Sequence, residues 1–294
     1  MCKHDLGKTE TVTLNERLKR VFVNNGWNLS EGDGAFRYYK TLFSKFFIIL
    51  KSLSLEEQNL IFPLISIYHY CPAVRYDSLV WRMVEEINAI WGEMSEALFI
   101  ITLTKPEDAG HSKGASFIVS HMRDQAIQEE YNLTRKPLYL YENQNLLKTK
   151  NENRNNSLIV FVDDFIGSGE TAIDTIKYFI NNIKKDTDRV MIYSFVAMQA
   201  ALEAITAIGV EVKAFVELPK GITESGLFKD VNGAKKLMMR LEEKLDIPAF
   251  YQLGYEQSEA TVTMMRTPDN TFPVFWYPEN KDGGKSLAPL PRYL

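Results

Sequence analysis

Short apolar runs alternate with amphipathic segments through the middle of the chain. Residues 97–103 and 158–162 are continuous apolar runs of strand length, as expected for strands buried on both faces. Further strand patterns lie at 137–141, 189–196 and 211–216, and helical spacing is clearest at 171–184 and 200–207. Strands that alternate with helices form a parallel sheet. The pattern therefore predicts an α/β fold, whose ligands bind beyond the carboxyl ends of the strands.

The N-terminal third is predicted to be mostly helical. Thr13 and Ser54 each begin a capping-box pattern, in which a hydroxyl and a glutamate three residues later satisfy the first N–H groups of a helix. Apolar residues recur at helical spacing through residues 35–50 and again after Pro72. The aromatic residues here follow the same spacing, which favours core packing over a base-stacking surface. We therefore divide the chain into a helical region, 1–95, and an α/β domain with a C-terminal tail, 96–294.

Composition narrows the class of protein. The 294 residues are 45% hydrophobic, enough for a large core, and the formal charge of −4 gives no basic field that would indicate nucleic-acid or membrane-surface binding. The two cysteines and four scattered histidines suggest neither a disulfide framework nor a zinc site. The N-terminus lacks the apolar segment of a signal peptide, and no apolar stretch is long enough to span a membrane. We expect a cytoplasmic protein.

The segment LIVFVDDFIGSGET at 158–171 carries the most chemical information. A short apolar strand leads into Asp163 and Asp164, then into a small-residue turn and the start of a helix. Glycines let the backbone approach a ligand, and the N–H groups and dipole of a helix N-terminus favour a phosphate. Acidic side chains suit ribose hydroxyls, which donate hydrogen bonds. This order of groups predicts a sugar-phosphate site.

The segment resembles the phosphoribosyl pyrophosphate (PRPP) motif of type I phosphoribosyltransferases. The resemblance implies that Asp163 and Asp164 are the catalytic acidic pair and hold the ribose 2′ and 3′ hydroxyls. It assigns the 5′-phosphate to the turn and helix start, namely Ile166, Gly167, Ser168, Gly169, Glu170 and Thr171. Glu170 departs from the family pattern, which often has a small residue there. Because its carboxylate would repel a phosphate, we expect it to point away from the turn.

The resemblance also implies a pyrophosphate loop and a closing loop. Ser112, Lys113 and the backbone of Gly114 follow the first sheet strand and stand where pyrophosphate is bound in the family. The alternative is a polar connector that caps a helix. The polar segment 142–156 stands where the family has a flexible loop, and its three cations, at Lys148, Lys150 and Arg154, would close on pyrophosphate. The alternative there is an inert, solvated loop.

The tail at 254–292 is similar to that of a phosphoribosyltransferase-like group from bacterial conflict (anti-phage) systems. The residues that carry this likeness are Tyr255, Thr267, Pro268, Asn270, Thr271, Pro273 and Trp276. Members of that group combine a helical N-terminal extension, a parallel-sheet phosphoribosyltransferase-like core and a C-terminal strand or arm. The likeness implies a hood in which Tyr255 or Trp276 stacks on the base. The alternative is that the tail packs down to complete the core.

Taken together, the motifs predict an enzyme that transfers the phosphoribosyl group from PRPP with release of pyrophosphate. Mg²⁺ would come with PRPP and bind phosphate and ribose oxygens, without direct ligation by protein side chains. One alternative is a nucleotide sensor that does not turn its ligand over. Another is an effector subunit of a defence assembly, in which residues 1–95 contact a protein partner. The acceptor of the phosphoribosyl group and the oligomeric state stay open at this stage.

Overall fold

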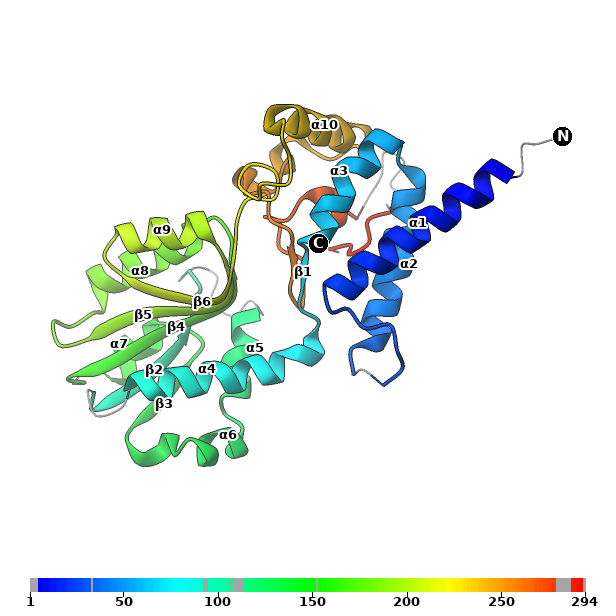
Figure 1. The fold of residues 1–294 in the computed structure, drawn as a ribbon. Helices are drawn as coiled ribbons and strands as arrows, with labels where there is room; N and C mark the ends of the chain where they lie inside the picture. Colours follow the sequence, from blue (N-terminus) through cyan, green and yellow to red (C-terminus); the bar gives the residue numbers. More distant parts are fainter. Residues whose placement is uncertain are drawn as a thin grey trace. The chain divides into compact units, whose positions relative to one another are not determined.

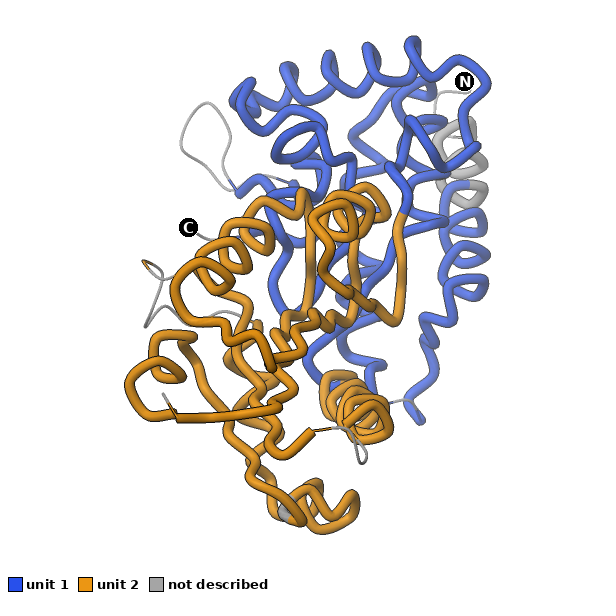
Figure 2. Tube along the Cα trace, turned by 90° about the vertical axis from the view of Figure 1, so that its left-hand side faces the viewer, with its two compact units in different colours: residues 1–74, 219–294 blue, residues 75–218 orange. Residues whose placement is uncertain are grey.

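The computed structural model describes residues 5–32, 34–91, 95–105, 107, 114–151, 153–278 and 287–292. Its contacts group the chain into two compact units, which Figure 2 distinguishes by colour. Unit 1 contains residues 1–74 together with 219–294, and unit 2 contains residues 75–218. The boundaries of these units differ from those of the predicted regions 1–95 and 96–294. Helix α4, at residues 76–91, belongs to the unit that contains the sheet, and the C-terminal segment belongs to the unit that contains the first helices.

Unit 2 is built on a parallel sheet. Within the described residues this sheet has five strands in the order β3-β2-β4-β5-β6. The strands are β2 (Ala97–Thr102), β3 (Leu138–Tyr141), β4 (Ser157–Ile166), β5 (Arg189–Met198) and β6 (Glu211–Leu218). The predicted parallel α/β fold is therefore confirmed. The central strand β4 extends four residues beyond the predicted run, so the acidic pair lies inside the strand rather than after it.

Helices cover both faces of this sheet (Figure 1). Helices α4 (Tyr76–Trp91) and α5 (Gly114–His121) pack on one face, whereas α8 (Glu170–Asn182) and α9 (Gln199–Ala207) lie on the other. The shorter elements of unit 2 are α6 (Gln125–Glu130), η3 (Leu133–Arg135) and α7 (Asn145–Lys150). Helix α5 leaves β2 toward one face and α8 leaves β4 toward the other. Because β2 and β4 are neighbours, their carboxyl ends form the topological switch point of the sheet, which is the position where sheets of this kind bind ligands in a crevice.

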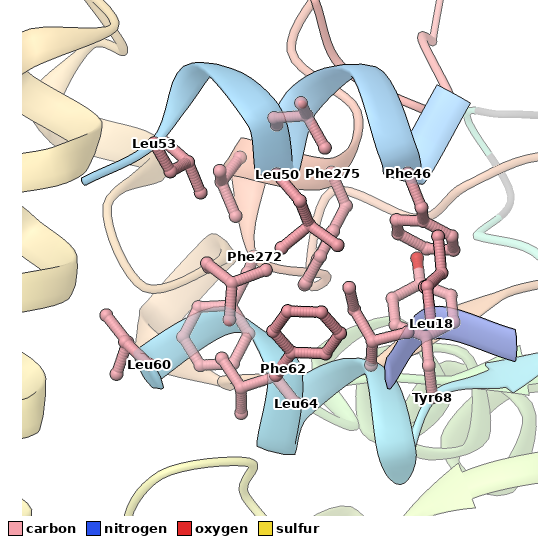
Figure 3. Packing of buried hydrophobic residues seen from close by; sticks show 14 of the residues in the cluster. Leu18, Phe46, Leu50, Leu53, Leu60, Phe62, Leu64, Tyr68, Phe272 and Phe275 are labelled. Carbon is pink, nitrogen blue, oxygen red and sulfur yellow. The ribbon is translucent and has the colours of Figure 1, made fainter. Parts of the chain in front are cut away.

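Unit 1 joins the two ends of the chain around one hydrophobic core. Its helices are α1 (Asp5–Asn24), α2 (Phe36–Ser52), α3 (Leu55–Ser66) and α10 (Val231–Lys244). Figure 3 shows Phe46 of α2 and Tyr68, which follows α3, beside Phe275 from the C-terminal segment. The ring of Phe275 meets those of Phe46 and Tyr68 edge-on, at centroid distances of 6.0 and 5.0 Å. The sequence pattern did not predict α10.

The two capping-box patterns have different outcomes. At Ser54 the prediction is confirmed, because its Oγ accepts from the Glu57 N–H at 3.3 Å and Glu57 Oε2 accepts from the Ser54 N–H at 2.7 Å. At Thr13 the prediction is wrong, because α1 begins at Asp5 and continues through this residue. The same four-residue pattern is compatible with a helix interior, where preceding residues already supply the hydrogen bonds of the turn.

The tail residues form a buried hydrogen-bond network in unit 1. Strand β7 (Val262–Thr263) pairs in parallel with β1 (His69–Tyr70), and it is shorter than the predicted strand at 260–264. Thr271 Oγ1 donates to the Val262 carbonyl at 2.6 Å, and the indole N–H of Trp276 donates to the Thr271 carbonyl at 2.7 Å. The remaining short elements are η1 (Ala73–Arg75), η4 (Ala249–Tyr251), η5 (Tyr255–Gln257) and η6 (Pro273–Phe275). The tail therefore completes the core of this unit.

Candidate active site

The acidic pair lies at the carboxyl end of the central strand in unit 2. Asp163 Oδ1 accepts from the backbone N–H of Asp164 at 2.9 Å, and both residues are half-buried. The Asp164 carboxylate points toward α4 and α5, where it contacts Gly114 and accepts a hydrogen bond at 2.6 Å from the hydroxyl of Tyr76. Burial raises the pKa of the Asp164 carboxyl above its usual value, and the bond from Tyr76 opposes this shift.

The Asp164 carboxylate occupies the space that a side chain at residue 114 would fill, so any residue other than glycine would displace it. A Cβ atom at residue 114 would lie 2.1 Å from Asp164 Oδ2, far inside contact distance. Gly114 is also the first residue of α5. The structure thus brings one predicted pyrophosphate residue against the predicted ribose acid. Ser112 and Lys113, the other two predicted pyrophosphate ligands, lie outside the described residues.

Tyr76 is a site residue that sequence reasoning missed. It is fully buried at the start of α4, and its ring packs edge-on against Phe117 of α5 and Phe195 of β5, each at 5.4 Å. A buried tyrosine needs a partner for its hydroxyl, but that partner lies 88 residues away in the sequence. The amphipathic pattern of α4 therefore indicates that Tyr76 is buried and cannot indicate that it serves Asp164.

The turn between β4 and α8 carries the residues that are predicted to bind the 5′-phosphate. Gly169 has φ +84°, a conformation that other residues adopt only with strain, and it approaches Ala201 of α9. Gly169 is also the N-cap residue of α8, so no side chain at that position occupies the first N–H groups of the helix. Ser168 Oγ accepts weakly from the Glu170 N–H at 3.4 Å. Of the other predicted phosphate residues, Ile166 is buried, whereas Gly167 and Thr171 are half-buried in the same turn.

Glu170 is paired with a lysine that sequence reasoning also missed. Its side chain is 45% exposed, and its Oε1 lies 3.1 Å from the Nζ of Lys105. The same Nζ lies 2.7 Å from Asp174 Oδ2. These two acids, Asp174 first, raise the pKa of Lys105, so this side chain carries its positive charge throughout the physiological range. Because Lys105 follows β2 and its two partners lie on α8, these ion pairs join the segments that follow the neighbouring strands β2 and β4.

Comparison with known protein families places this site in context. A family model named PRTase-CE, for phosphoribosyltransferase, matches residues 47–290. The chain belongs to the PRTase-CE family. This match spans most of the chain and confirms its resemblance to the type I phosphoribosyltransferases. No curated protein matches the chain.

Solved structures similar to this PRTase-CE chain include three distant proteins. Orotate phosphoribosyltransferase from Aeropyrum pernix is 16% identical, with a TM-score of 0.31, and the match covers 48% of this chain and 70% of that one. Hypoxanthine-guanine phosphoribosyltransferase from Schistosoma mansoni, in complex with IMP, is 12% identical with a TM-score of 0.32. The match covers 51% of this chain and 65% of that one. A hypothetical protein from Neisseria gonorrhoeae with bound ppGpp is 14% identical with a TM-score of 0.34. The match covers 58% of this chain and 96% of that one.

The prediction that the segment 142–156 closes on pyrophosphate is wrong for Arg154, whereas closing by Lys148 and Lys150 stays a prediction. Part of the segment 142–156 folds into α7, whose Leu147 is fully buried. The guanidinium of Arg154 is buried against Asp188 at 2.7 Å and also donates to the Ile183 carbonyl. Both Arg154 and Asp188 precede strands, so this ion pair lies at the amino edge of the sheet, opposite the acidic pair. Arg154 therefore does not close on a ligand at the carboxyl edge.

The two residues predicted to form a base hood both belong to unit 1, and they differ in exposure. Trp276 is fully buried, and its ring packs edge-on against Tyr251 at 5.2 Å, so the packing alternative describes this residue. Tyr255 is half-buried, and its ring lies 5.5 Å from that of Phe250, which is 67% exposed. Stacking of Tyr255 on a base stays a prediction.

The described part of the PRTase-CE chain has neither a clustered metal site nor a membrane-spanning helix. Among those residues, no cluster of three or more His, Cys, Asp or Glu side chains has the arrangement of a metal site. None of the described helices combines the length and apolar character that crossing a bilayer requires.

Proposed function

We propose that this chain binds PRPP or a ribose 5-phosphate nucleotide in unit 2 and transfers the phosphoribosyl group with release of pyrophosphate. The observation that carries the proposal is the convergence of three groups at one crevice. These are the acidic pair on β4, the glycine turn at the start of α8, and Gly114 at the start of α5 in contact with Asp164. Their order along the chain and membership of the PRTase-CE family support the same ligand.

Each group has a chemical role in this proposal. The N–H groups at the start of α8 bind the 5′-phosphate, because they point away from the helix and the dipole favours an anion. The carboxylates of Asp163 and Asp164 accept hydrogen bonds from the ribose hydroxyls. Tyr76 fixes the direction of the Asp164 carboxylate, so that the ribose is held without a further loss of side-chain freedom.

The reaction itself requires positioning and charge stabilisation. The bond between ribose C1 and the pyrophosphate oxygen breaks, and pyrophosphate leaves with the electron pair. A nucleophile of the acceptor forms the new bond to C1 and loses its proton. Positive charge develops on the ribose ring in the transition state, where the two carboxylates stabilise it. When Mg²⁺ is bound with PRPP, it neutralises charge on the leaving pyrophosphate.

A second candidate is a sensor that binds a nucleotide without turnover, and one observation favours it. The Asp164 carboxylate contacts the first residue of α5, so the helix start nearest the predicted pyrophosphate residues already faces an acid. A negative charge there opposes pyrophosphate but tolerates a nucleoside monophosphate, which has none at C1. A role in anti-phage defence, with a protein partner on residues 1–95, rests on the tail likeness, and co-purification of a partner tests it.

Calorimetry with ribose 5-phosphate and PRPP, with and without Mg²⁺, tests the binding proposal. Loss of one charge-assisted hydrogen bond costs about 1.5–3 kcal/mol, so Asp163→Asn with Asp164→Asn should raise Kd at least about tenfold. Asp186→Asn, an exposed acid at the amino edge of the sheet, is the matched control. Equal affinity of the double variant and the control for both ligands would refute the site.

Pyrophosphate release separates the enzyme from the sensor. The wild-type protein is incubated with PRPP, Mg²⁺ and a panel of purine and pyrimidine bases and amines. Base-dependent release that the double aspartate variant lacks supports transfer. Tight binding of nucleotides without release under any condition supports the sensor.

A further inference from the structure

Lys105 joins two acids on the first turns of α8. Its Nζ lies 3.1 Å from Glu170 Oε1 and 2.7 Å from Asp174 Oδ2, and its side chain is 21% exposed. Glu170 and Asp174 are four residues apart on the helix, so they share one side of it and would repel each other without a cation between them. The lysine comes from the segment after β2, on the other side of the crevice.

The same two acids oppose a phosphate at the neighbouring turn. A dianion bound to the N–H groups at the start of α8 would lie within one helical turn of the Glu170 carboxylate. Two unit charges 4 Å apart in a surface-like dielectric repel strongly enough to weaken binding by about a thousandfold. The departure of Glu170 from the small residue common in the family therefore needs compensation if the turn binds phosphate.

We propose that Lys105 is the counter-charge that lets this turn accept a phosphate despite Glu170. This inference rests on the proposed function. The ammonium cancels one of the two nearby negative charges, and it donates a hydrogen bond to Glu170 Oε1. Stability alone does not account for the arrangement, because the acids are 45% and 50% exposed, and ion pairs at such positions contribute little to folding.

A double-mutant cycle distinguishes a counter-charge from a direct phosphate ligand. Wild type, Lys105→Met, Glu170→Gln and the double variant are titrated with ribose 5-phosphate at one fixed ionic strength of about 0.1 M. If Lys105 acts by neutralising Glu170, Lys105→Met raises Kd at least about tenfold when Glu170 is present and less than about threefold when it is glutamine. Thermal unfolding of each variant checks that unit 2 stays folded.

The control for charge is Lys177→Met, which removes an exposed cation from the same helix about 10 Å further along its axis. This control should change Kd less than about twofold, because the distance is about one Debye length at 0.1 M salt. Equal losses for Lys105→Met in both Glu170 backgrounds would overturn the proposal and make Lys105 a direct ligand. No loss in either background would overturn it as well.

Failure of the proposed function has a different signature. If neither the wild type nor Glu170→Gln binds ribose 5-phosphate, the turn is not a phosphate site, and both proposals fall. If only Glu170→Gln binds, the turn is a phosphate site that Lys105 does not make usable, so the counter-charge is refuted and the site is retained.

Discussion

Tyr76→Phe removes one hydroxyl from the least exposed part of the candidate site. The ring of Tyr76 is fully buried between Phe117 and Phe195, and phenylalanine keeps both edge-on contacts. The change therefore removes the 2.6 Å hydrogen bond to the Asp164 carboxylate and keeps the packing of the ring. This makes the variant a test of whether the Asp164 carboxylate depends on its buried donor.

The cost of the variant should rise with pH. A hydrogen bond contributes about 1 kcal/mol to stability when its acceptor is neutral and about 1.5–3 kcal/mol when its acceptor is charged. The folded-state pKa of Asp164 is raised above its ordinary 3.8, so the stability that this group contributes is present below 3.8 and is lost as pH rises through the folded pKa. Loss of the Tyr76 bond raises that pKa further. We expect the variant to be destabilised by about 1 kcal/mol at low pH and by about 1.5–3 kcal/mol once Asp164 ionises.

Urea unfolding of wild type and variant from pH 4 to pH 9 measures this difference. Tyr178→Phe is the matched control, because that hydroxyl donates to the neutral side-chain oxygen of Asn145 at 3.1 Å in the same unit. Its cost should be the same at every pH. A Tyr76→Phe cost that is also independent of pH would refute the assignment of a charge-dependent bond. So would a cost that falls as pH rises.

Two further predictions concern other buried ionisable side chains. Burial raises the pKa of Glu242 to about 8, so unit 1 should lose stability as pH rises from about 4.5 to 8. In urea unfolding, Glu242→Gln should abolish this pH dependence. The control variant Glu243→Gln, which changes an exposed residue, should keep it. An unchanged pH profile in Glu242→Gln would contradict this. Arg154→Met leaves the carboxylate of Asp188 buried without its cation, which should cost about 3–5 kcal/mol of stability, with no change in Kd for ribose 5-phosphate under conditions where the protein is folded. Lys150→Met, which changes an exposed residue, is the control. If Arg154→Met weakens ligand binding while the protein is fully folded, Arg154 does act in a closing loop.

Local patterns determined the order of elements and the position of the phosphate turn. Apolar runs and helical spacing depend on neighbours within a few residues, so the sheet strands and the helix after the glycine turn follow directly from the sequence. The same holds for the capping box at Ser54, whose partners are three residues apart. The acidic pair likewise follows from the types and order of the residues at 158–171, and its role in a sugar-phosphate site stays a prediction.

Only the tertiary structure decided which distant side chains serve that site. Tyr76 lies 88 residues before its partner Asp164, and Lys105 lies 65 residues before Glu170. The local sequence pattern does not indicate such pairs, because it depends only on residues within the same helix, strand or loop. The burial of Arg154, from a segment that reads as a solvated loop, has the same cause. An ion pair with a distant residue, rather than local polarity, decides whether a charge faces water or the interior.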